Sequence, residues 1–544
     1  MRSFLLLLAL ACTFVDVHAD TYPKNRRVDV INYRFALELQ DRDDRIAGTA
    51  DVDLRFVEDG VTALRLDLTT HDSATGLGMT VSAVSANGAG VAFTHRDHAL
   101  GVTLPKPSEK GQQLRLRIAY AGQPASGLKI ANNKHGDRTF FSDNWPDKAR
   151  HWLPTVDHVY DKATSEMIVT APAHYQVISN GLLIEETDLS GGRRLTHWRQ
   201  SVPIAPWLYV LGVARFAVQQ VDTFQGKAIQ TWVYAQDRDA GFYDFAVPTR
   251  DALEFYSDKV GPFSYEKLAN VQSNSVSGGM EAASAIFYSE GSVTGDRSIR
   301  WRNVVIHEIA HQWFGNAVTE SDWDDVWLSE GFATYFTLLY IEHAYGRDEF
   351  LGGLADSRRR ILEFDKQRPD YRIVHDNLSD MSQVTTGQIY QKGAWILHML
   401  RGIVGDEVFW TGIRSYYRAH QNGHATTADF RGEMERASGR DLRVFFDQWL
   451  TRGGLVRLEG DWSYRANTKA ITIRLTQRDP ARTFAMPLQV AVYLAGSATP
   501  TITTVQVSDV SHEFQIPADQ PPARVVLDPN HLVLMESAFV EAKR

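Results

Sequence analysis

The stretch that decides the fold of this chain is "HEIAHQWFGNAV", residues 307–318. Two histidines, His307 and His311, stand four residues apart, and Glu308 follows the first. Positions i and i+4 of a helix share one face, so both imidazoles can bind one cation. The carboxylate of Glu308 can then reach a water on that cation without being a ligand. The spacing predicts a helix that carries a catalytic metal site.

A second segment completes the ligand set. "SDWDDVWLSEGFATYF", residues 321–336, has the pattern of a helix whose large apolar side chains face a core, and it contains Glu330. Two histidines and one glutamate with an open fourth position are the ligands of a catalytic zinc rather than a structural one. The competing interpretation is an amphipathic helix with two chance histidines and a surface acid at Glu330. Large apolar residues flank Glu330, which favours the zinc site, so one Zn²⁺ is the predicted cofactor.

Length and composition limit the possible classes of protein. The chain has 544 residues, of which 44% are hydrophobic and 23% charged, so it is too long for one core and too apolar for disorder. The net charge of -9 supplies no basic surface, and no motif of a nucleic-acid-binding fold is present. We expect a multidomain enzyme without a nucleic-acid partner.

The hydrophobic period changes twice along the chain. Strand-like alternation extends to about residue 216, as in "VINYRFALEL", a helical period follows, and short strands such as "ITIRLTQR" return near the end. In the helical part, Pro248 lies near the start of one helix, and Thr426 with Asp429 forms a possible capping box. The predicted fold class is multidomain α+β. The expected domains are an N-terminal β domain (20–224), a mostly helical catalytic domain (225–452) and a small β-sandwich (453–544).

The first 19 residues have the pattern of a secretory signal peptide. Arg2 precedes an apolar run, and small residues flank a possible cleavage after Ala19. That run is too short to span a bilayer, and no later stretch reaches the roughly 20 apolar residues of a transmembrane segment. A secreted or periplasmic protein is expected. Lipoprotein anchoring through Cys12 is the less favoured alternative, because Ala9 stands where a larger aliphatic residue is usual.

Cys12 is also the only cysteine of the chain. Cleavage after Ala19 removes it, so disulfides, thiolate metal sites and a cysteine nucleophile are excluded for the mature protein. Any transition metal must be held by His, Asp and Glu.

Three further segments carry a family resemblance: "SGGMEAASAIFY" (277–288), "YQKGAWILHML" (390–400) and "ARHWLPTVDHVYDKAT" (149–164). Together with the HExxH stretch and "WLSEGFATYF", in this order along the chain, they resemble the M1 zinc metalloaminopeptidases of the gluzincin group. The resemblance implies a saddle-like β domain, a thermolysin-like catalytic domain and a β-sandwich. This chain resembles a short three-domain form, because it ends where many relatives continue into a large helical domain.

The resemblance also implies roles for single residues. Glu308 is expected to be the general base, and Tyr390 to donate a hydrogen bond to the oxyanion of the transition state. Glu281 is expected to pair with the free α-ammonium of a peptide, which makes the enzyme an exopeptidase. Gly278, Gly279 and Met280 belong to the same motif and are expected to line the substrate.

Three positions depart from the family pattern. Ala282 replaces an asparagine, and Trp145 stands where many relatives have Glu or Gln near the substrate amine, so Glu281 is expected to bind the amine largely alone. Thr337 replaces an acid behind a zinc histidine, so a hydroxyl or Asp325 is expected to orient that imidazole.

The function predicted from these residues is a secreted zinc aminopeptidase that acts on peptides with a free N-terminus. The alternatives are a weakly active or inactive peptide-binding relative, and an epoxide hydrolase of the leukotriene A4 hydrolase type. The sequence leaves open the preferred N-terminal residue and the oligomeric state.

Overall fold

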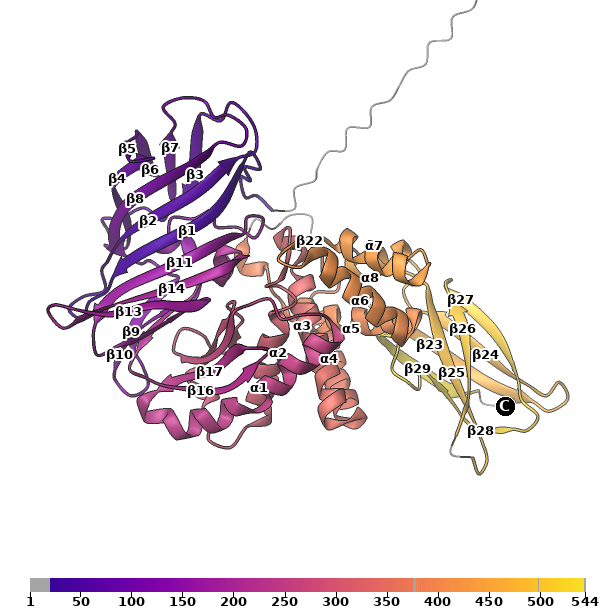
Figure 1. Cartoon of the computed structure of the whole chain (residues 1–544). Helices are drawn as coiled ribbons and strands as arrows, with labels where there is room; N and C mark the ends of the chain where they lie inside the picture. The colour runs from indigo at the N-terminus through magenta and orange to yellow at the C-terminus, as the bar shows by residue number, and fades with distance from the viewer. Residues whose placement is uncertain (1–19, 375–377, 379, 498, 543–544) are drawn as a thin grey trace, which may run out of the picture.

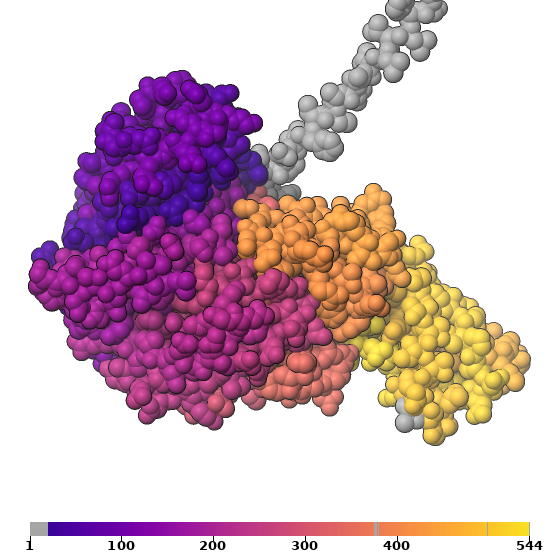
Figure 2. Space-filling view, in the orientation of Figure 1, coloured from indigo at the N-terminus to yellow at the C-terminus, as the bar shows by residue number. Residues whose placement is uncertain are grey.

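The computed structural model describes residues 20–374, 378, 380–497 and 499–542. The predicted signal peptide, with Cys12, lies outside the described residues. Strands, then helices, then strands follow one another along the chain, and the N-terminal and C-terminal strands lie at opposite ends of the molecule with the helices between them (Figures 1 and 2). The multidomain α+β class, with a β-rich N-terminal part and a helical catalytic part, is confirmed.

The N-terminal part is built on an eight-stranded sheet of order β13-β14-β11-β1-β2-β8-β4-β5. Its strands are β1 (Val28–Glu38), β2 (Ile46–Phe56), β4 (Gly78–Ala86), β5 (Ala89–Gly90), β8 (Gln113–Gln123), β11 (Ala163–Pro172), β13 (Leu182–Leu189) and β14 (Arg193–Ile204). Two smaller sheets accompany it. They contain β3 (Ala63–Asp67), β6 (Phe93–Arg96) and β7 (Ala99–Thr103), and β9 (Leu128–Asn132), β10 (Arg138–Ser142), β12 (Gln176–Ser179) and β15 (Leu211–Ala214).

The predicted alternation in β1 holds for most of the strand. Tyr33, Phe35 and Leu37 are buried, as expected for one face of a half-buried sheet. Ile31 is exposed and Val30 is buried instead, because the pairing of β1 with β2 shifts register between Val30 and Asn32. A one-residue irregularity of this kind moves the preceding side chains to the other face, so Ile31 departs from the alternation that "VINYRFALEL" predicts.

The described residues of the catalytic part form a five-stranded sheet, β16-β17-β18-β20-β19, and eight α-helices. The strands are β16 (Phe216–Phe224), β17 (Lys227–Tyr234), β18 (Lys267–Ser273), β19 (Gly279–Met280) and β20 (Ala285–Ser289). The helices are α1 (Arg238–Lys259), α2 (Ile299–His311), α3 (Trp327–Tyr345), α4 (Arg347–Gln367), α5 (Gly387–Val404), α6 (Asp406–His420), α7 (Thr427–Ser438) and α8 (Arg443–Leu450). Between them a short pair joins β21 (Val318–Glu320) to β22 (Gly423–Ala425). The proposed boundary at residue 224 falls between β16 and β17, which pair in one sheet.

Local signals set several helix ends. The capping box at the start of α7 is confirmed, because the Thr426 side chain accepts from the Asp429 backbone and the Asp429 side chain accepts from the Thr426 backbone. The helix expected to begin near Pro248 starts earlier, at Arg238, and its backbone is non-helical at Val247 and Pro248. Proline lacks the N–H that a helix interior needs, which explains the break.

Two sheets form the C-terminal part, as the predicted β-sandwich requires. One contains β27 (Ser511–Pro517), β24 (Ala470–Gln477), β23 (Val456–Arg465) and β29 (Met535–Glu541); the other contains β26 (Thr501–Val507), β25 (Met486–Leu494) and β28 (Pro522–Leu527). The alternating Ile471, Ile473 and Leu475 of β24 are all buried, as the sequence pattern predicts. Among the described residues, no helix has the length and apolar character that crossing a membrane requires.

Candidate active site

The three predicted zinc ligands converge between two helices. Helix α2 carries His307 and His311, whose Nε2 atoms lie 3.1 Å apart, and α3 carries Glu330. The Oε2 atom of Glu330 lies 3.4 Å from Nε2 of His307 and 3.2 Å from Nε2 of His311. Ligands at about 2.0–2.1 Å from a tetrahedral ion are separated by roughly 3.3 Å, so these donor atoms fit Zn²⁺.

The electrostatics of this cluster favour a bound cation. Burial alone would lower the pKa of the His311 imidazole, but the charges of Glu281 and Glu330 raise this pKa to about 10. Burial would likewise raise the pKa of Glu330, whereas His311 and His307 lower it to about 2. A carboxylate in a buried anionic cluster is compensated by positive charge, which a metal ion supplies.

A hydroxyl and a carbonyl orient His311 from behind. Its Nδ1 atom lies 3.1 Å from the main-chain oxygen of Phe314 and 3.1 Å from the Ser329 hydroxyl. A hydrogen bond from Nδ1 to a carbonyl leaves the Nε2 lone pair free for a metal. The sequence left a hydroxyl or Asp325 open for this role; at His311 the hydroxyl is that of Ser329, while the Asp325 carboxylate accepts from Thr427. Ser329 stands next to Glu330, so adjacency to a ligand was the signal that could have found it.

The carboxylate of Glu308 is buried beside the ligands. Burial and then the charge of Glu281 raise the pKa of Glu308 well above its ordinary value, which makes its carboxylate a stronger proton acceptor. A Cβ atom on Gly279 would lie 2.2 Å from Oε1 of Glu308. Any larger side chain at residue 279 would collide with the Glu308 carboxylate, so the position requires glycine. Nothing lies within 4 Å of a Cβ at Gly278, which faces open space.

Two glycines bring Tyr390 to the ligand cluster. Helices α3 and α5 pack so closely that a Cβ on Gly393 would lie 2.9 Å from the Cα atom of Gly331. One turn along α5, the Tyr390 hydroxyl donates to Oε1 of Glu330 at 2.6 Å. Burial and the charge of Glu330 raise the pKa of Tyr390, so its hydroxyl keeps its proton and remains a donor.

The loop that holds Glu281 is fixed by the same stretch that carries the histidines. Gln312 and Asn316 donate side-chain hydrogen bonds of 2.9 Å and 2.7 Å to the main-chain oxygen of Glu281. One carboxylate oxygen of Glu281 lies 3.9 Å from Nδ1 of His311. Burial raises the pKa of this carboxyl to about 7. Sequence reasoning missed Gln312 and Asn316, although both lie within "HEIAHQWFGNAV".

A buried lysine from the N-terminal part secures the loop after His311. Lys162, in the "DKAT" end of the predicted family block, donates to the main-chain oxygens of Asn316, Ala317 and Gly423 at 3.0, 3.0 and 2.7 Å. Burial lowers the pKa of Lys162 to about 7. Through Lys162, the family block at residues 149–164 contacts the loop that follows the metal-binding histidines.

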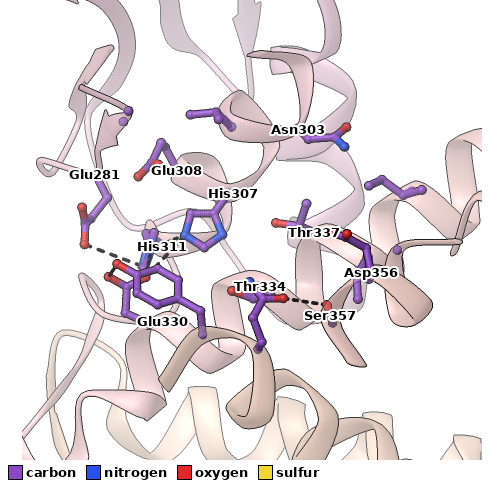
Figure 3. A pocket seen from close by; sticks show the side chains of 18 of the residues that line it. Glu281, Asn303, His307, Glu308, His311, Glu330, Thr334, Thr337, Asp356 and Ser357 are labelled. Atoms are coloured by element: carbon purple, nitrogen blue, oxygen red, sulfur yellow. Dashed lines mark hydrogen bonds and ion pairs between the residues drawn. The ribbon is translucent and has the colours of Figure 1, made fainter. Parts of the chain in front are cut away.

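A cavity of about 540 Å³ joins the ligands to the other candidate residues. Figure 3 shows Glu281 at one end, the histidines near the middle, and Asp356 and Ser357 at the other end. The predicted site residues that line it are Gly278, Gly279, Glu281, His307, Glu308, His311, Glu330 and Tyr390.

A second cavity of about 430 Å³ adjoins the first on the side of the N-terminal part. It shares Glu281, Glu330 and Tyr390 with the first cavity and includes Met280 and Trp145. All predicted site residues therefore border one of two cavities that share part of their lining.

Comparison with known families identifies the chain. A model of the peptidase M1 N-terminal domain matches residues 30–208, and a model of the peptidase family M1 domain matches residues 246–449. The chain belongs to peptidase family M1. The family shows the same order of parts as the sequence predicts, a β-rich domain followed by the catalytic domain.

Curated M1 relatives match the chain over part of their length. The glutamyl aminopeptidase of Rattus norvegicus is 29% identical over 325 residues, 58% of this chain and 34% of that protein. The probable aminopeptidase 2 of Sulfurisphaera tokodaii is 28% identical over 319 residues, 56% of this chain and 40% of that protein. The match thus spans about a third to two fifths of the length of these relatives.

Solved M1 structures match more completely. The M1 zinc metallopeptidase of Deinococcus radiodurans is 26% identical with a TM-score of 0.65, over 78% of this chain and 94% of that chain. A mutant of that protein bound to Tyr-Ser-Ala substrate is 27% identical with a TM-score of 0.67, over the same shares of the two chains. Zinc is therefore the metal that the family and the donor atoms both support.

Proposed function

We propose that this chain is a zinc-dependent aminopeptidase that hydrolyses N-terminal residues from peptides. The observation that carries the proposal is that the metal-ligand set, Glu308, Tyr390 and Glu281 all border one cavity of about 540 Å³. The aminopeptidase names of the curated relatives and the peptide bound to the Deinococcus protein support the same activity.

The proposed division of labour follows from the positions of the side chains. A zinc ion held by His307, His311 and Glu330 would polarise the scissile carbonyl and lower the pKa of a water molecule. Glu308 accepts the proton of the attacking water and delivers it to the nitrogen of the leaving amine. The Tyr390 hydroxyl turns from Glu330 to the oxyanion on the carbonyl carbon, where negative charge develops only in the transition state.

The exopeptidase character rests on Glu281 in this proposal. Its carboxylate accepts from the substrate α-ammonium, and the bonds from Gln312 and Asn316 hold its backbone at a fixed distance from His311. Because this anion lies at a fixed position beside the metal ligands, a substrate whose ammonium binds Glu281 places its first peptide bond at the metal. Gly278, Gly279 and Met280 form the adjoining edge, along which the substrate backbone lies.

The broader features of the proposal concern architecture and location. The three-domain form has a saddle-like N-terminal domain (20–224), a thermolysin-like domain (225–452) and a β-sandwich (453–544). Residues 1–19 act as a signal peptide in this proposal, so the enzyme works outside the cytoplasm on peptides. N-terminal sequencing of the protein from its native host tests the cleavage after Ala19.

The other interpretations differ in measurable ways. A binding relative retains peptides without turning them over, and an epoxide hydrolase turns over an epoxide in place of peptides. A binding relative has no need for the carboxylate of Glu308 beside the ligands, and nothing in the described site specifically supports an epoxide substrate.

Matched free and N-acetylated peptides test the proposal. The holoenzyme should cleave the free peptide and refuse the acetylated one, because only the first carries an ammonium for Glu281. Glu281→Ala should lower turnover of the free peptide by about 30-fold or more, since removing one partner of a desolvated charge pair costs about 2–5 kcal/mol.

Glu254→Ala is the matched control, because it removes an exposed acid from α1. Equal cleavage of both peptides by the unaltered enzyme would make it an endopeptidase with an open cleft. Absence of turnover with zinc bound would favour the binding relative.

A further inference from the structure

We propose that Trp145 selects the N-terminal side chain of the substrate, and that its pocket prefers aromatic side chains over charged ones. The inference rests on the proposed function, because it takes Glu281 as the binding site of the α-ammonium. It concerns the second cavity, whose residues Trp145, Lys129 and Asp143 come from the N-terminal part of the chain.

The arrangement of the two cavities assigns them different parts of a substrate. Glu281, Glu330 and Tyr390 border both spaces. A peptide with its ammonium at Glu281 and its first carbonyl at the metal ligands extends toward Asp356 and Ser357, at the far end of the first cavity (Figure 3). The first side chain branches from the carbon between the ammonium and the carbonyl. It therefore enters the second cavity.

Trp145 is held rigidly at the wall of this second cavity. Its ring lies nearly perpendicular to that of Trp207, with centroids 4.8 Å apart, and to that of Trp323, with centroids 5.1 Å apart. Trp207 comes from the N-terminal part and Trp323 from the catalytic part, and both are fully buried. Trp145 is only partly buried, so the part of its surface that its neighbours leave uncovered faces the cavity. A ring fixed in advance loses little conformational entropy on binding.

The lining of this cavity is mostly polar, and its apolar and aromatic side chains lie near Trp145 in the same lining. Val276, Met280 and Tyr390 border the same cavity as Trp145. A flat side chain placed among them removes apolar surface from water and makes aromatic contacts, which are worth more than the buried area alone.

Glu281 is assigned to the substrate ammonium and Glu330 to the metal, which leaves one charged group of each sign in the lining, Lys129 and Asp143. Lys129 donates its ammonium to the main-chain oxygen of Asn274 at 2.7 Å, and the Asp143 carboxylate lies 3.6 Å from the Lys148 ammonium. Asp143 therefore has a cationic partner, whereas the partner of Lys129 is a neutral carbonyl. A charged substrate side chain would be desolvated while meeting one group of its own sign. We therefore expect the apolar surface of Trp145 and its neighbours to discriminate between N-terminal side chains.

A panel of substrates with one leaving group tests this inference on the zinc-loaded enzyme. The N-terminal residues are Phe, Leu, Ala, Lys and Glu. We expect kcat/KM for Phe to exceed that for Ala by about 10-fold or more, with Lys and Glu below Phe, because one large apolar contact discriminates by about 10- to 200-fold. Trp145→Ala should reduce the Phe/Ala ratio about 10-fold, mainly through KM for Phe. Trp145→Phe should keep most of the ratio.

Binding of free L-phenylalanine and L-alanine, measured by calorimetry, supplies a readout that does not need turnover. Phenylalanine should bind more tightly than alanine to the unaltered holoenzyme, and Trp145→Ala should remove most of the difference. Trp410→Ala is the control, because Trp410 is a partly buried tryptophan of α6 outside both cavity linings. It should leave both ratios unchanged.

The outcomes separate this inference from the proposed function. Peptide turnover with a Phe/Ala ratio that Trp145→Ala leaves intact would overturn the role of Trp145 alone. A preference of the unaltered enzyme for Lys or Glu would assign selection to Asp143 or Lys129. Tighter binding of phenylalanine that depends on Trp145, without turnover of any peptide, would support the pocket and overturn the aminopeptidase. Absence of both binding and turnover would overturn both.

Discussion

Among the described residues, three groups of histidine and carboxylate have the spacing of a metal site, and two of them share His311 in the candidate active site. The ligand group of that site differs from the third group, which lies apart from it, in what lies between the side chains. In one, ligand atoms of His307, His311 and Glu330 lie within 4.8 Å of one another; in the other, those of Asp20, His158 and Asp322 do. Each also has a tyrosine ring stacked on a histidine, Tyr390 over His307 at 6.0 Å and Tyr22 over His158 at 4.7 Å.

A lysine ammonium makes the difference between the two clusters. Lys24 forms an ion pair with Asp322 and lies 3.8 Å from Asp20, and His158 is hydrogen-bonded to Asp20 at 2.5 Å. These charges compensate one another within the protein. The same contacts link residues 20–24 to His158 of the N-terminal part and to Asp322 of the catalytic part. Within the part of the chain that the structure describes, no lysine pairs with the active-site cluster, which borders a cavity of about 540 Å³. Donor spacing alone therefore does not define a metal site; an uncompensated charge and access for a ligand are also needed.

The largest expected effect is a difference in bound zinc between a variant of the active-site cluster and a variant of the lysine-containing cluster. His311→Ala should lower bound zinc from about one ion per chain to nearly none and abolish turnover, because two ligands rarely hold a catalytic zinc. His158→Gln should retain about one zinc per chain. Elemental analysis of the two purified variants decides this. Full zinc in His311→Ala, or zinc lost from His158→Gln, would mean that the clusters have been assigned the wrong way round.

Glu308→Gln should separate metal binding from proton transfer within the active-site cluster. All three ligands remain, so zinc should stay bound, while kcat falls by about 10³-fold or more because the proton acceptor is gone. Steady-state kinetics on a metal-replete variant measures the loss. Activity close to that of the unaltered enzyme would exclude Glu308 as the general base.

The two stacked tyrosines should respond differently to loss of their hydroxyls. Tyr390→Phe should lower kcat by about 10²-fold with little change in KM, as expected for a donor that acts in the transition state. Tyr22→Phe removes a hydrogen bond to Asp67 and should leave kcat unchanged. An effect of Tyr390→Phe confined to KM would move this residue from catalysis to substrate binding.

The smallest expected effect concerns the stability of the lysine-containing cluster. Lys24→Met should lower the free energy of unfolding by about 3 kcal/mol at neutral pH, because buried carboxylates lose their cation. Burial already raises the pKa of Asp322, and Lys24 opposes that rise. Without Lys24 the folded protein should bind a proton at Asp322 more readily, so the loss should shrink as the pH falls toward about 5.

Urea denaturation of Lys24→Met at two pH values measures this dependence. The control is Lys469→Met, which removes an exposed ion pair with Asp519 and should change stability by less than about 1 kcal/mol. A loss that grows on acidification would contradict the proposed role of Lys24.

The sequence by itself determined the features that depend on near neighbours. The i, i+4 histidines, the capping box of α7 and the alternation of β24 all follow from contacts within one turn or one strand face. The order of motifs was enough to identify the family. The zinc ligands could be named because helix spacing and an apolar context are both readable along the chain.

Only the tertiary structure decided contacts between residues far apart in sequence. The close packing of Gly331 against Gly393, and the hydrogen bonds from Gln312 to the Glu281 loop, depend on how separate elements meet. The sequence marked Trp145 as a departure from the family, but its place among Trp207 and Trp323 could not be read from it. The physical reason is that packing selects these partners after the local elements have formed, and no local pattern encodes which surfaces then face each other.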